Sequence, residues 1–264
     1  MFLRSANELR PYQLGPHPQE ILPRDATLCA RESVRAAKVY PTNEVDDGNA
    51  FAKAIAKYQA LFESLTDGPT AGIRAPVPVD LDRRTIDVKG GGYFLNASQV
   101  GICVIPERAW LKGIEPLAHA FAIVVCVEHG RVPEYDNLAN AWVRDVARAA
   151  GDLRATEIAC CLSGYLRLLG FSARAHTPRG TLLDCDRLAV LAGIATRKET
   201  GLFNPFLGGR FSLSVISTDY ELDVDLPLAE DVEAVSGLHY WLGMNGAESG
   251  RERQRRAKRS SHLS

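Results

Sequence analysis

Two short apolar runs constrain the fold of this chain more than any other feature. Residues 100–105 (VGICVI) and 121–127 (FAIVVCV) are dense in β-branched side chains, which favour an extended backbone. The apolar stretch that contains the second run is interrupted by His119 and is too short to cross a bilayer. We therefore predict that both runs form central strands of a sheet in a globular domain.

Helical periodicity lies on either side of these strands. From Asn49 onward, apolar residues recur at spacings of three and four, until residues 67–69 (DGP) stop the pattern. A longer helical stretch follows Asn137 and ends at Gly170, a glycine of the kind that caps helix C-termini. Gly151 lies within this stretch, and we expect it to divide the stretch into two helices.

The remaining segments complete a layered domain. Residues 184–193 (DCDRLAVLAG) predict a short helix, and residues 171–176 and 211–217 predict strands. Residues 85–88 predict another short strand, which is followed at residues 89–92 by a flexible turn with three glycines. This order of elements predicts an α+β fold with a central mixed sheet flanked by helices.

Local composition divides the chain into three parts. Residues 1–48 are expected to form an irregular arm, because five prolines break any long helix there. Residues 49–240 hold the predicted α+β domain. Residues 241–264 contain six arginines and lysines without apolar periodicity, so we expect a basic, disordered tail.

Composition excludes several classes of function. Hydrophobic residues make up 46% of the chain and charged residues 24%, which allows an ordinary core. The net charge of −1 gives no reason to expect a nucleic-acid partner. The first residues lack the apolar segment of a secretion signal, so we expect a cytoplasmic protein that does not bind a membrane. The six cysteines form no Cys-x-x-Cys pair, which favours buried thiols over zinc or iron–sulfur ligands.

Four segments between residues 96 and 222 carry a family resemblance. They read NASQVGICVIPERAW, HAFAIVVCVEH, EIACCLSGYLRLLGFSARAH and LDCDRLAVLAGIATRKETGLFNPFLGGRFSLSVISTDYEL. In this order they resemble the cobalamin-binding part of the reductive dehalogenases and, more distantly, epoxyqueuosine reductase. The resemblance implies a fold related to the flavin nitroreductases, with a corrinoid bound in the base-off state in a pocket.

The resemblance also implies which residues would contact a corrinoid. Residues 201–209 (GLFNPFLGG) would run along it, since small residues let the backbone approach a large flat ligand. In that arrangement the Asn204 amide would bond to a corrin side-chain amide. His176 is either a lower ligand of the corrinoid or a hydrogen-bonded surface histidine. The expected corrinoid contacts are Gly201, Phe203, Asn204, Phe206, Gly208 and Gly209.

The chain departs from the family at three places. No cysteine follows Asp219, where the family carries its iron–sulfur clusters, so we expect no iron–sulfur cluster here. The family's proton-donor tyrosine falls at Gly151 or Asp152, and its substrate-side lysine or arginine falls at Ser212. No motif therefore assigns a catalytic group. The candidate catalytic residues are Asp152, Tyr165 and Arg210.

These departures favour a degenerate reductive-dehalogenase-like module, which binds a corrinoid or a partner subunit without catalysis of its own. One alternative is a cobalamin-dependent reductive dehalogenase, an oxidoreductase fed by a separate electron donor. A second alternative is a corrinoid carrier or processing protein. The module hypothesis predicts a homo- or hetero-oligomer with a catalytic or electron-donating subunit, which contacts an exposed apolar patch or the N-terminal arm.

Overall fold

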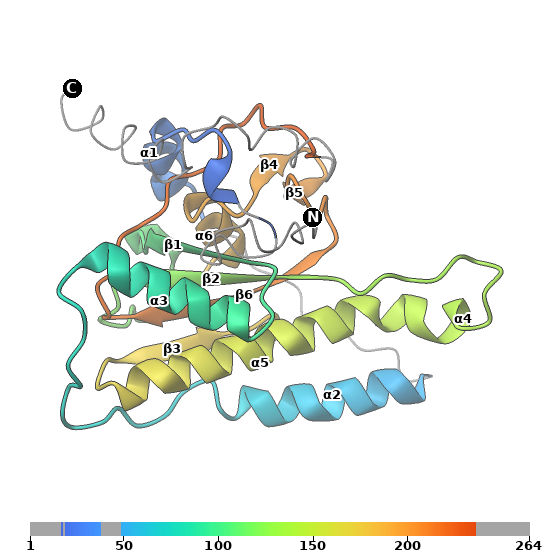
Figure 1. The fold of residues 1–264 in the computed structure, drawn as a ribbon, viewed down its shortest axis with the longest axis horizontal. Coiled ribbons are helices and arrows are strands. Elements are labelled where there is room, and N and C mark those ends of the chain that lie inside the picture. Colours follow the sequence, from blue (N-terminus) through green and yellow to red (C-terminus); the bar gives the residue numbers. More distant parts are fainter. Residues whose placement is uncertain (1–16, 18, 38–48, 236–264) are drawn as a thin grey trace, which may run out of the picture.

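A four-stranded antiparallel sheet forms the centre of the molecule (Figure 1). The structure is a computed structural model, and it describes residue 17, residues 19–37 and residues 49–235. A separate two-stranded hairpin, β4–β5, lies beside the sheet. In spatial order the sheet strands are β1 (Gln99–Val104), β2 (Phe121–Glu128), β6 (Phe211–Thr218) and β3 (Ala173–His176), and the hairpin strands are β4 (Thr196–Lys198) and β5 (Gly201–Phe203).

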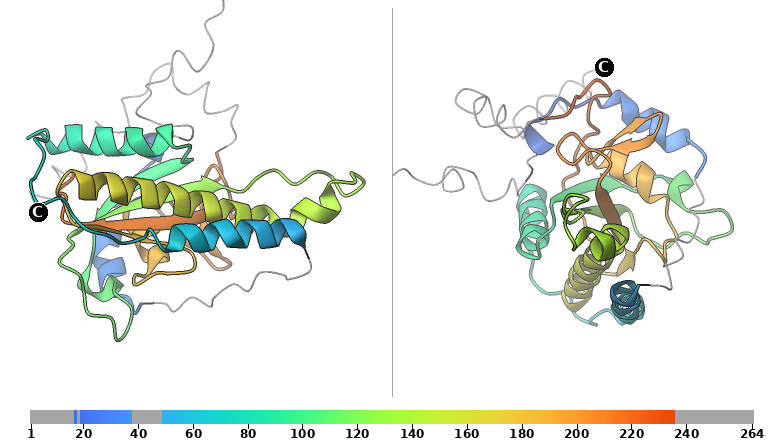
Figure 2. Two further views of the ribbon diagram at one scale, coloured as in Figure 1. Left: turned by 90° about the horizontal axis from the view of Figure 1, so that it is seen from below. Right: turned by 90° about the vertical axis from the view of Figure 1, so that its right-hand side faces the viewer.

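Helices cover both faces of this sheet (Figures 1 and 2). Helices α3 and α5 lie across one face, while α6 and the hairpin lie on the other, and α2 packs on the outside of α5. The α-helices are α1 (Thr27–Val34), α2 (Ala50–Glu63), α3 (Leu81–Phe94), α4 (Asn140–Val143), α5 (Ala147–Leu168) and α6 (Cys185–Leu191). The described residues also form three short 3₁₀ helices, η3 (Gln19–Ile21), η4 (Glu107–Ala109) and η5 (Arg144–Val146).

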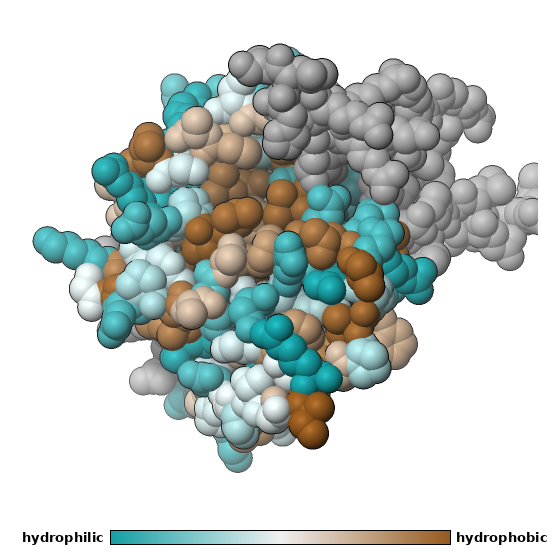
Figure 3. Space-filling model, turned by 90° about the vertical axis from the view of Figure 1, so that its left-hand side faces the viewer, coloured by the Kyte–Doolittle hydropathy of each residue, from teal (hydrophilic) through white to brown (hydrophobic). Residues whose placement is uncertain are grey.

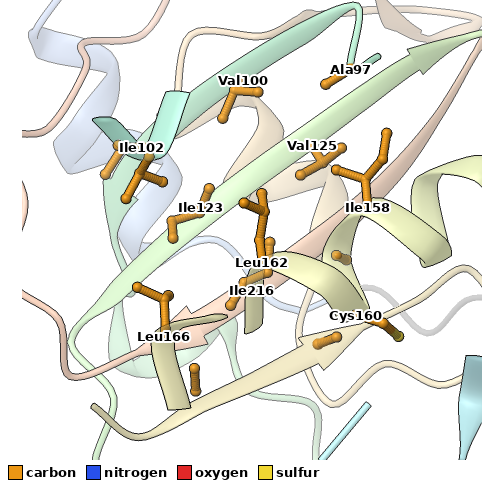
Figure 4. Packing of buried hydrophobic residues seen from close by; sticks show 14 of the residues in the cluster. Ala97, Val100, Ile102, Ile123, Val125, Ile158, Cys160, Leu162, Leu166 and Ile216 are labelled. Carbon is orange, nitrogen blue, oxygen red and sulfur yellow. The ribbon is translucent and has the colours of Figure 1, made fainter. Parts of the chain in front are cut away.

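Strand β2 is buried on both faces, and its alternating side chains build two separate cores. Ile123 and Val125 point toward α5, where Ile158 and Leu162 pack against them (Figure 4). The residues between them belong to the second cluster, on the side of α6 and the hairpin. The period of two that defines a strand thus explains why this run is apolar throughout. The run at residues 121–127 forms a central strand, β2, as predicted, but the run at residues 100–105 forms β1 at the edge of the sheet, where α3 and α6 bury its apolar side chains.

The helix boundaries follow the expected end signals. Asn49 caps α2, because its side-chain oxygen accepts a hydrogen bond from the backbone N–H of Phe51 at 2.9 Å. Asp184 caps α6 in the same way through the N–H of Arg187 at 3.1 Å. Gly170 follows α5 with a φ of +84°, the left-handed conformation that favours glycine. These three predicted helix ends are confirmed.

Three expectations about secondary structure are wrong. Residues 85–92 lie within α3 and form neither a strand nor a glycine turn, since close packing outweighs the helix-breaking tendency of glycine there. A Cβ on Gly92 would lie 2.6 Å from the side chain of Val100, so this glycine lets α3 approach β1. Gly151 does not divide α5, whose preceding irregularity is the 3₁₀ turn η5.

Two expectations about the architecture are also corrected. The α+β class is confirmed, but every pairing in the described four-stranded sheet is antiparallel, where a mixed sheet was expected. The arm at residues 1–48 was expected to be irregular, yet its described part contains η3 and α1. The predicted basic tail at residues 241–264 lies outside the described residues. No helix among the described residues has both the length and the apolar character needed to cross a bilayer.

Apolar residues also reach the surface on the side of the molecule shown in Figure 3, where they lie among hydrophilic residues. Exposed apolar side chains that occur singly are ordinary on globular proteins.

A buried ion cluster fastens the N-terminal arm to the domain. Lys89 of α3 lies 2.8 Å from an oxygen of Asp225 and 3.4 Å from an oxygen of Glu20, and all three side chains are buried. The other oxygen of Asp225 accepts a 2.8 Å hydrogen bond from the backbone N–H of Ile102, at the edge of the sheet. Burial alone would raise the pKa of Asp225, but Lys89 and Arg24 outweigh it and hold this pKa below its ordinary value.

Replacing the central cation of this cluster should destabilise the fold strongly. We expect Lys89→Met to lower the free energy of unfolding by about 3–5 kcal/mol, because it leaves buried carboxylates without their partner. Lys53→Met is the matched control, since Lys53 is exposed, and it should change stability by less than about 0.5 kcal/mol. Chemical denaturation measures both values, and an equal effect of the two variants contradicts the prediction.

The same variant should alter the response to acid. A carboxyl with a lowered folded pKa stabilises the protein above its unfolded pKa of about 3.9, and this contribution is lost as the pH falls through the folded pKa. Lys89→Met removes one of the cations that lower the pKa of Asp225. The variant should therefore lose less stability than the parent over this acidic range, in denaturation curves measured at several pH values.

Candidate functional site

The segment expected to line a corrinoid is anchored by a fully buried asparagine. The Asn204 side chain is 0% exposed. Its nitrogen donates to the backbone oxygen of Ile194 at 2.7 Å and to the side-chain oxygen of Gln99. Its oxygen accepts from the backbone N–H groups of Phe206 and Leu207, at 2.9 and 3.1 Å. An amide has two donor hydrogens and two lone pairs, so Asn204 has no hydrogen-bonding group left for an outside ligand.

The neighbouring residues of this segment serve the fold as well. Leu207 is buried in the cluster between the hairpin and the sheet, and Phe206 packs against that cluster. Gly201 and Gly208 have φ values of +128° and +64°, so both occupy turn conformations that favour glycine. Phe203 is half-buried, with the Lys198 ammonium 5.8 Å from its ring centre.

These residues do not fit a corrinoid at the expected place. The face of the sheet beneath the hairpin is packed with apolar side chains from β1, β2, β6 and α6, including Leu188, and with Trp110 just after η4. Gly209 is exposed and supplies only backbone. The expected polar contact, Asn204, is already bonded within the protein.

A second group of residues lies where β2 and β6 meet the first half of α5. The Ser212 hydroxyl donates to a carboxylate oxygen of Asp152 and lies 3.0 Å from Nε2 of His129. Ser212 is 5% exposed, and the side chain of Asp152 is 16% exposed. A serine has a single hydroxyl hydrogen, so with Asp152 ionised the His129 Nε2–H must donate to Ser212. Nδ1 of the neutral ring then carries the lone pair.

Close packing between α5 and β2 brings these three side chains together. A Cβ on Gly151 would lie 2.7 Å from Cδ2 of His129 and 3.0 Å from the Ser212 hydroxyl, so only glycine fits there without displacement. The backbone N–H of His129 also donates to the carbonyl of Arg210 at 3.0 Å, which continues the β2–β6 pairing.

Burial sets the proton affinities in this group. Burial raises the pKa of Asp152 above its ordinary value, against the opposing effects of the Ser212 hydrogen bond and of Arg148. Burial lowers the pKa of His129, and the charge of Asp152 opposes that change. The Asp152 carboxylate thus orients the His129 imidazole through the Ser212 hydroxyl. This arrangement can hold the ring in one tautomer, with Nδ1 as the proton acceptor.

The structure brings together two of the three catalytic candidates. Asp152 belongs to this group, and Arg210 lies at its edge, where its guanidinium donates to the carbonyl of Gly130 at 3.3 Å. Tyr165 lies about 20 Å further along α5 by helix geometry and is half exposed. His176 was expected to be a surface histidine or a cobalt ligand, and it is neither. It is fully buried, and its ring nitrogens contact the Ser217 hydroxyl at 2.8 Å and the backbone N–H of Leu182 at 3.3 Å.

The cysteines take part in none of these groups. All six are free thiols, and Cys103, Cys126 and Cys160 are buried. Burial raises the pKa of Cys126 well above its ordinary value, so this thiol stays protonated at neutral pH. Within the described ranges, no group of three or more His, Cys, Asp and Glu side chains is placed to hold a metal ion.

Comparison with solved structures identifies relatives over nearly the whole chain. The catabolic reductive dehalogenase NpRdhA, in complex with 3-bromo-4-hydroxybenzoic acid, matches with a TM-score of 0.78 and 34% identity over 94% of this chain. A reductive dehalogenase whose structure suggests a mechanism for B12-dependent dehalogenation matches with a TM-score of 0.77 and 34% identity over 96% of this chain. The chain is related to the reductive dehalogenases. N-terminally tagged NpRdhA also matches, with a TM-score of 0.72 and 36% identity over 84% of this chain and 31% of its own.

The relationship covers only part of these reductive dehalogenases. This chain spans about a third of their length, 35% in the first two matches. Epoxyqueuosine reductase matches at a TM-score of 0.42 and 11% identity, over 56% of this chain and 48% of that one, which is too distant to support an argument. No protein-family model and no curated protein sequence matches. The resemblance inferred from the four sequence segments is confirmed.

The sequence analysis did not identify His129 as a site residue. The available signal was the antiparallel register: Glu128 pairs with Phe211, so His129 falls opposite Arg210 and diagonally across from Ser212. Once β2 and β6 are taken as neighbours, His129 and Ser212 are brought close together. The antiparallel pairing itself was not evident from the sequence.

The charge of Asp152 should be visible in the titration of His129. We expect Asp152→Asn to lower the pKa of His129 further, because the carboxylate favours the protonated ring and burial disfavours it. A pH titration of the His129 ring signals by NMR measures the shift. Asp87→Asn is the control, since Asp87 pairs with Arg83 on the surface of α3 and should leave His129 unchanged. An unchanged or raised pKa in Asp152→Asn contradicts the assignment.

Proposed function

We propose that this chain is a reductive-dehalogenase-like module that holds no corrinoid and works by binding a catalytic dehalogenase unit. The observation that carries the proposal is the complete internal use of the Asn204 amide. A segment that recognised a corrin side chain would need a free polar group directed outward. Here the polar group is directed inward and holds the segment to the sheet.

The second support is the share of the relatives that this chain matches. The part of a reductive dehalogenase that matches this chain is about a third of that protein, and the other two thirds belong to the same polypeptide there. The catalytic unit that this module binds is carried either in the same polypeptide or in another chain. The proposal does not depend on which arrangement holds.

The residues at the family's catalytic positions also support a role without dehalogenation. The resemblance places a tyrosine and a basic side chain there, and this chain has Asp152 and Ser212 bonded to each other. A raised pKa makes Asp152 a weaker acid than an ordinary carboxyl, and its carboxylate already accepts a hydrogen bond from the hydroxyl of the buried Ser212. At these aligned positions the chain therefore has neither the proton-donor tyrosine nor the lysine or arginine that the resemblance implies.

An anaerobic titration with cob(II)alamin tests the proposal. We expect electron paramagnetic resonance and visible spectra to remain those of free cobalamin when the protein is in stoichiometric amount. The positive control, treated identically, is the reductive dehalogenase whose structure suggests a mechanism for B12-dependent dehalogenation.

A stoichiometric base-off spectrum contradicts the proposal and favours the alternatives. Turnover of an aryl halide with an artificial reductant would then indicate a cobalamin-dependent reductive dehalogenase. Binding without turnover would indicate a corrinoid carrier or processing protein.

A further inference from the structure

Helix α2 carries a second apolar stripe, which is exposed along its length and meets Trp142 of α4 at its start. Its inner stripe, which includes Ala52 and Ile55, is buried against α5 and its N-terminal turn. The outer stripe is shifted by one residue along the sequence, which turns it about 100° around the helix. Figures 1 and 2 show α2 at the edge of the molecule, with α5 as its neighbour. The outer stripe consists of Phe51, Ala54, Tyr58 and Leu61, and it continues at Leu65 just beyond the helix.

These residues are exposed and follow the spacing of a coiled-coil seam. Phe51, Tyr58, Leu61 and Leu65 have 47%, 56%, 57% and 50% of their surface accessible. The intervals are three, four, three and four residues, which is the a/d pattern that receives a second helix. At its start the stripe meets Trp142 of α4, whose ring lies 6.1 Å from that of Phe51 in an edge-on arrangement. The side chain of Asn49 fixes α4 there by a 3.0 Å hydrogen bond to the Trp142 carbonyl.

The charges beside the stripe select the partner. Its open flank is formed by Lys53, Lys57, Ala60 and Ser64, all exposed, with two cations and no acid. The only acid of α2, Glu63, is held on another side, where its carboxylate accepts from the Thr177 hydroxyl at 2.6 Å. A partner helix with acidic residues beside its own apolar seam would pair with the two lysines.

A second copy of this chain fits the stripe poorly. Antiparallel pairing of two identical helices about Tyr58 would place the neighbouring Lys57 residues of both copies against each other. Parallel pairing would direct Lys57 toward Phe62 of the other copy, which already packs against the core and offers no acidic partner. Like charges thus disfavour the antiparallel arrangement, and the missing acidic partner disfavours the parallel one.

We infer that the exposed stripe of α2, from Phe51 to Leu65, is a docking surface for an amphipathic helix flanked by acidic residues. The inference deepens the proposed function and rests on it for the partner, which would be a helix of the catalytic dehalogenase unit. Docking at the stripe itself does not depend on whether the module holds a corrinoid.

Two synthetic peptides of three heptads test the inference. Both carry leucine at a and d, and one has glutamate and the other lysine at the flanking e and g positions, so that neither pairs with itself. Fluorescence anisotropy with the full chain should show the glutamate peptide binding about tenfold more tightly than the lysine peptide. Tyr58→Glu combined with Leu61→Glu should weaken binding of the glutamate peptide about tenfold or more.

Two further variants complete the design. Phe94→Glu, at an apolar residue of α3 that is 85% exposed, is the matched control and should leave binding unchanged. Lys53→Glu combined with Lys57→Glu should reverse the preference between the two peptides. Circular dichroism confirms that each variant is folded, as expected for exposed positions.

Three results overturn the inference: neither peptide binds, the Phe94 variant loses as much affinity as the stripe variant, or the parent chain forms a dimer that the stripe variant lacks. The last result, measured by sedimentation, would assign the surface to a second copy. A chain that binds cob(II)alamin and still binds the glutamate peptide through the stripe would refute the proposed function and leave this inference standing.

Discussion

One buried side chain connects the parts of the molecule that bear on its function. The Asn204 amide joins the turn after β5 to the backbone beyond α6 at Ile194 and to β1 at Gln99. Gln99 in turn donates to the carbonyl of His17 at 2.9 Å, so the N-terminal arm belongs to the same network. A buried amide left without partners would destabilise the fold, and full satisfaction makes this network rigid. The segment that a corrinoid would need is therefore part of the scaffold.

The fold that this chain shares with the reductive dehalogenases has apolar packing on both faces of its sheet. The hairpin β4–β5 and α6 close one face of the sheet with apolar side chains, and α5 closes the other. Where α5 meets β2 and β6, Asp152, Ser212 and His129 form a chain of hydrogen bonds. The features that remain without an internal role lie on the outside, above all the apolar stripe of α2. This distribution agrees with a module that acts through its surface.

Sequence patterns predicted the features that depend on neighbouring residues. Strands β1 and β2 follow from runs of β-branched residues, and the helix ends at Asn49, Asp184 and Gly170 follow from local capping chemistry. The errors arose where distant packing decides the structure. Residues 90–92 are helical although all three are glycine, because α3 lies close against Val100. No local sequence pattern reveals this contact. Asn204 bonds to groups that lie 10 and 105 residues earlier, so its inward direction was not visible either.

Hydrogen–deuterium exchange tests the central claim, that the Asn204 segment is a closed part of the scaffold. The informative amides are those of Phe206 and Leu207, which donate to Asn204, and that of Gly208, which donates to the Asn204 carbonyl at 2.8 Å. The account predicts slow exchange at all three amides and no change when excess cob(II)alamin is added under anaerobic conditions. Fast exchange without cobalamin, or added protection confined to residues 201–209 with it, would contradict the claim and indicate an open corrinoid site.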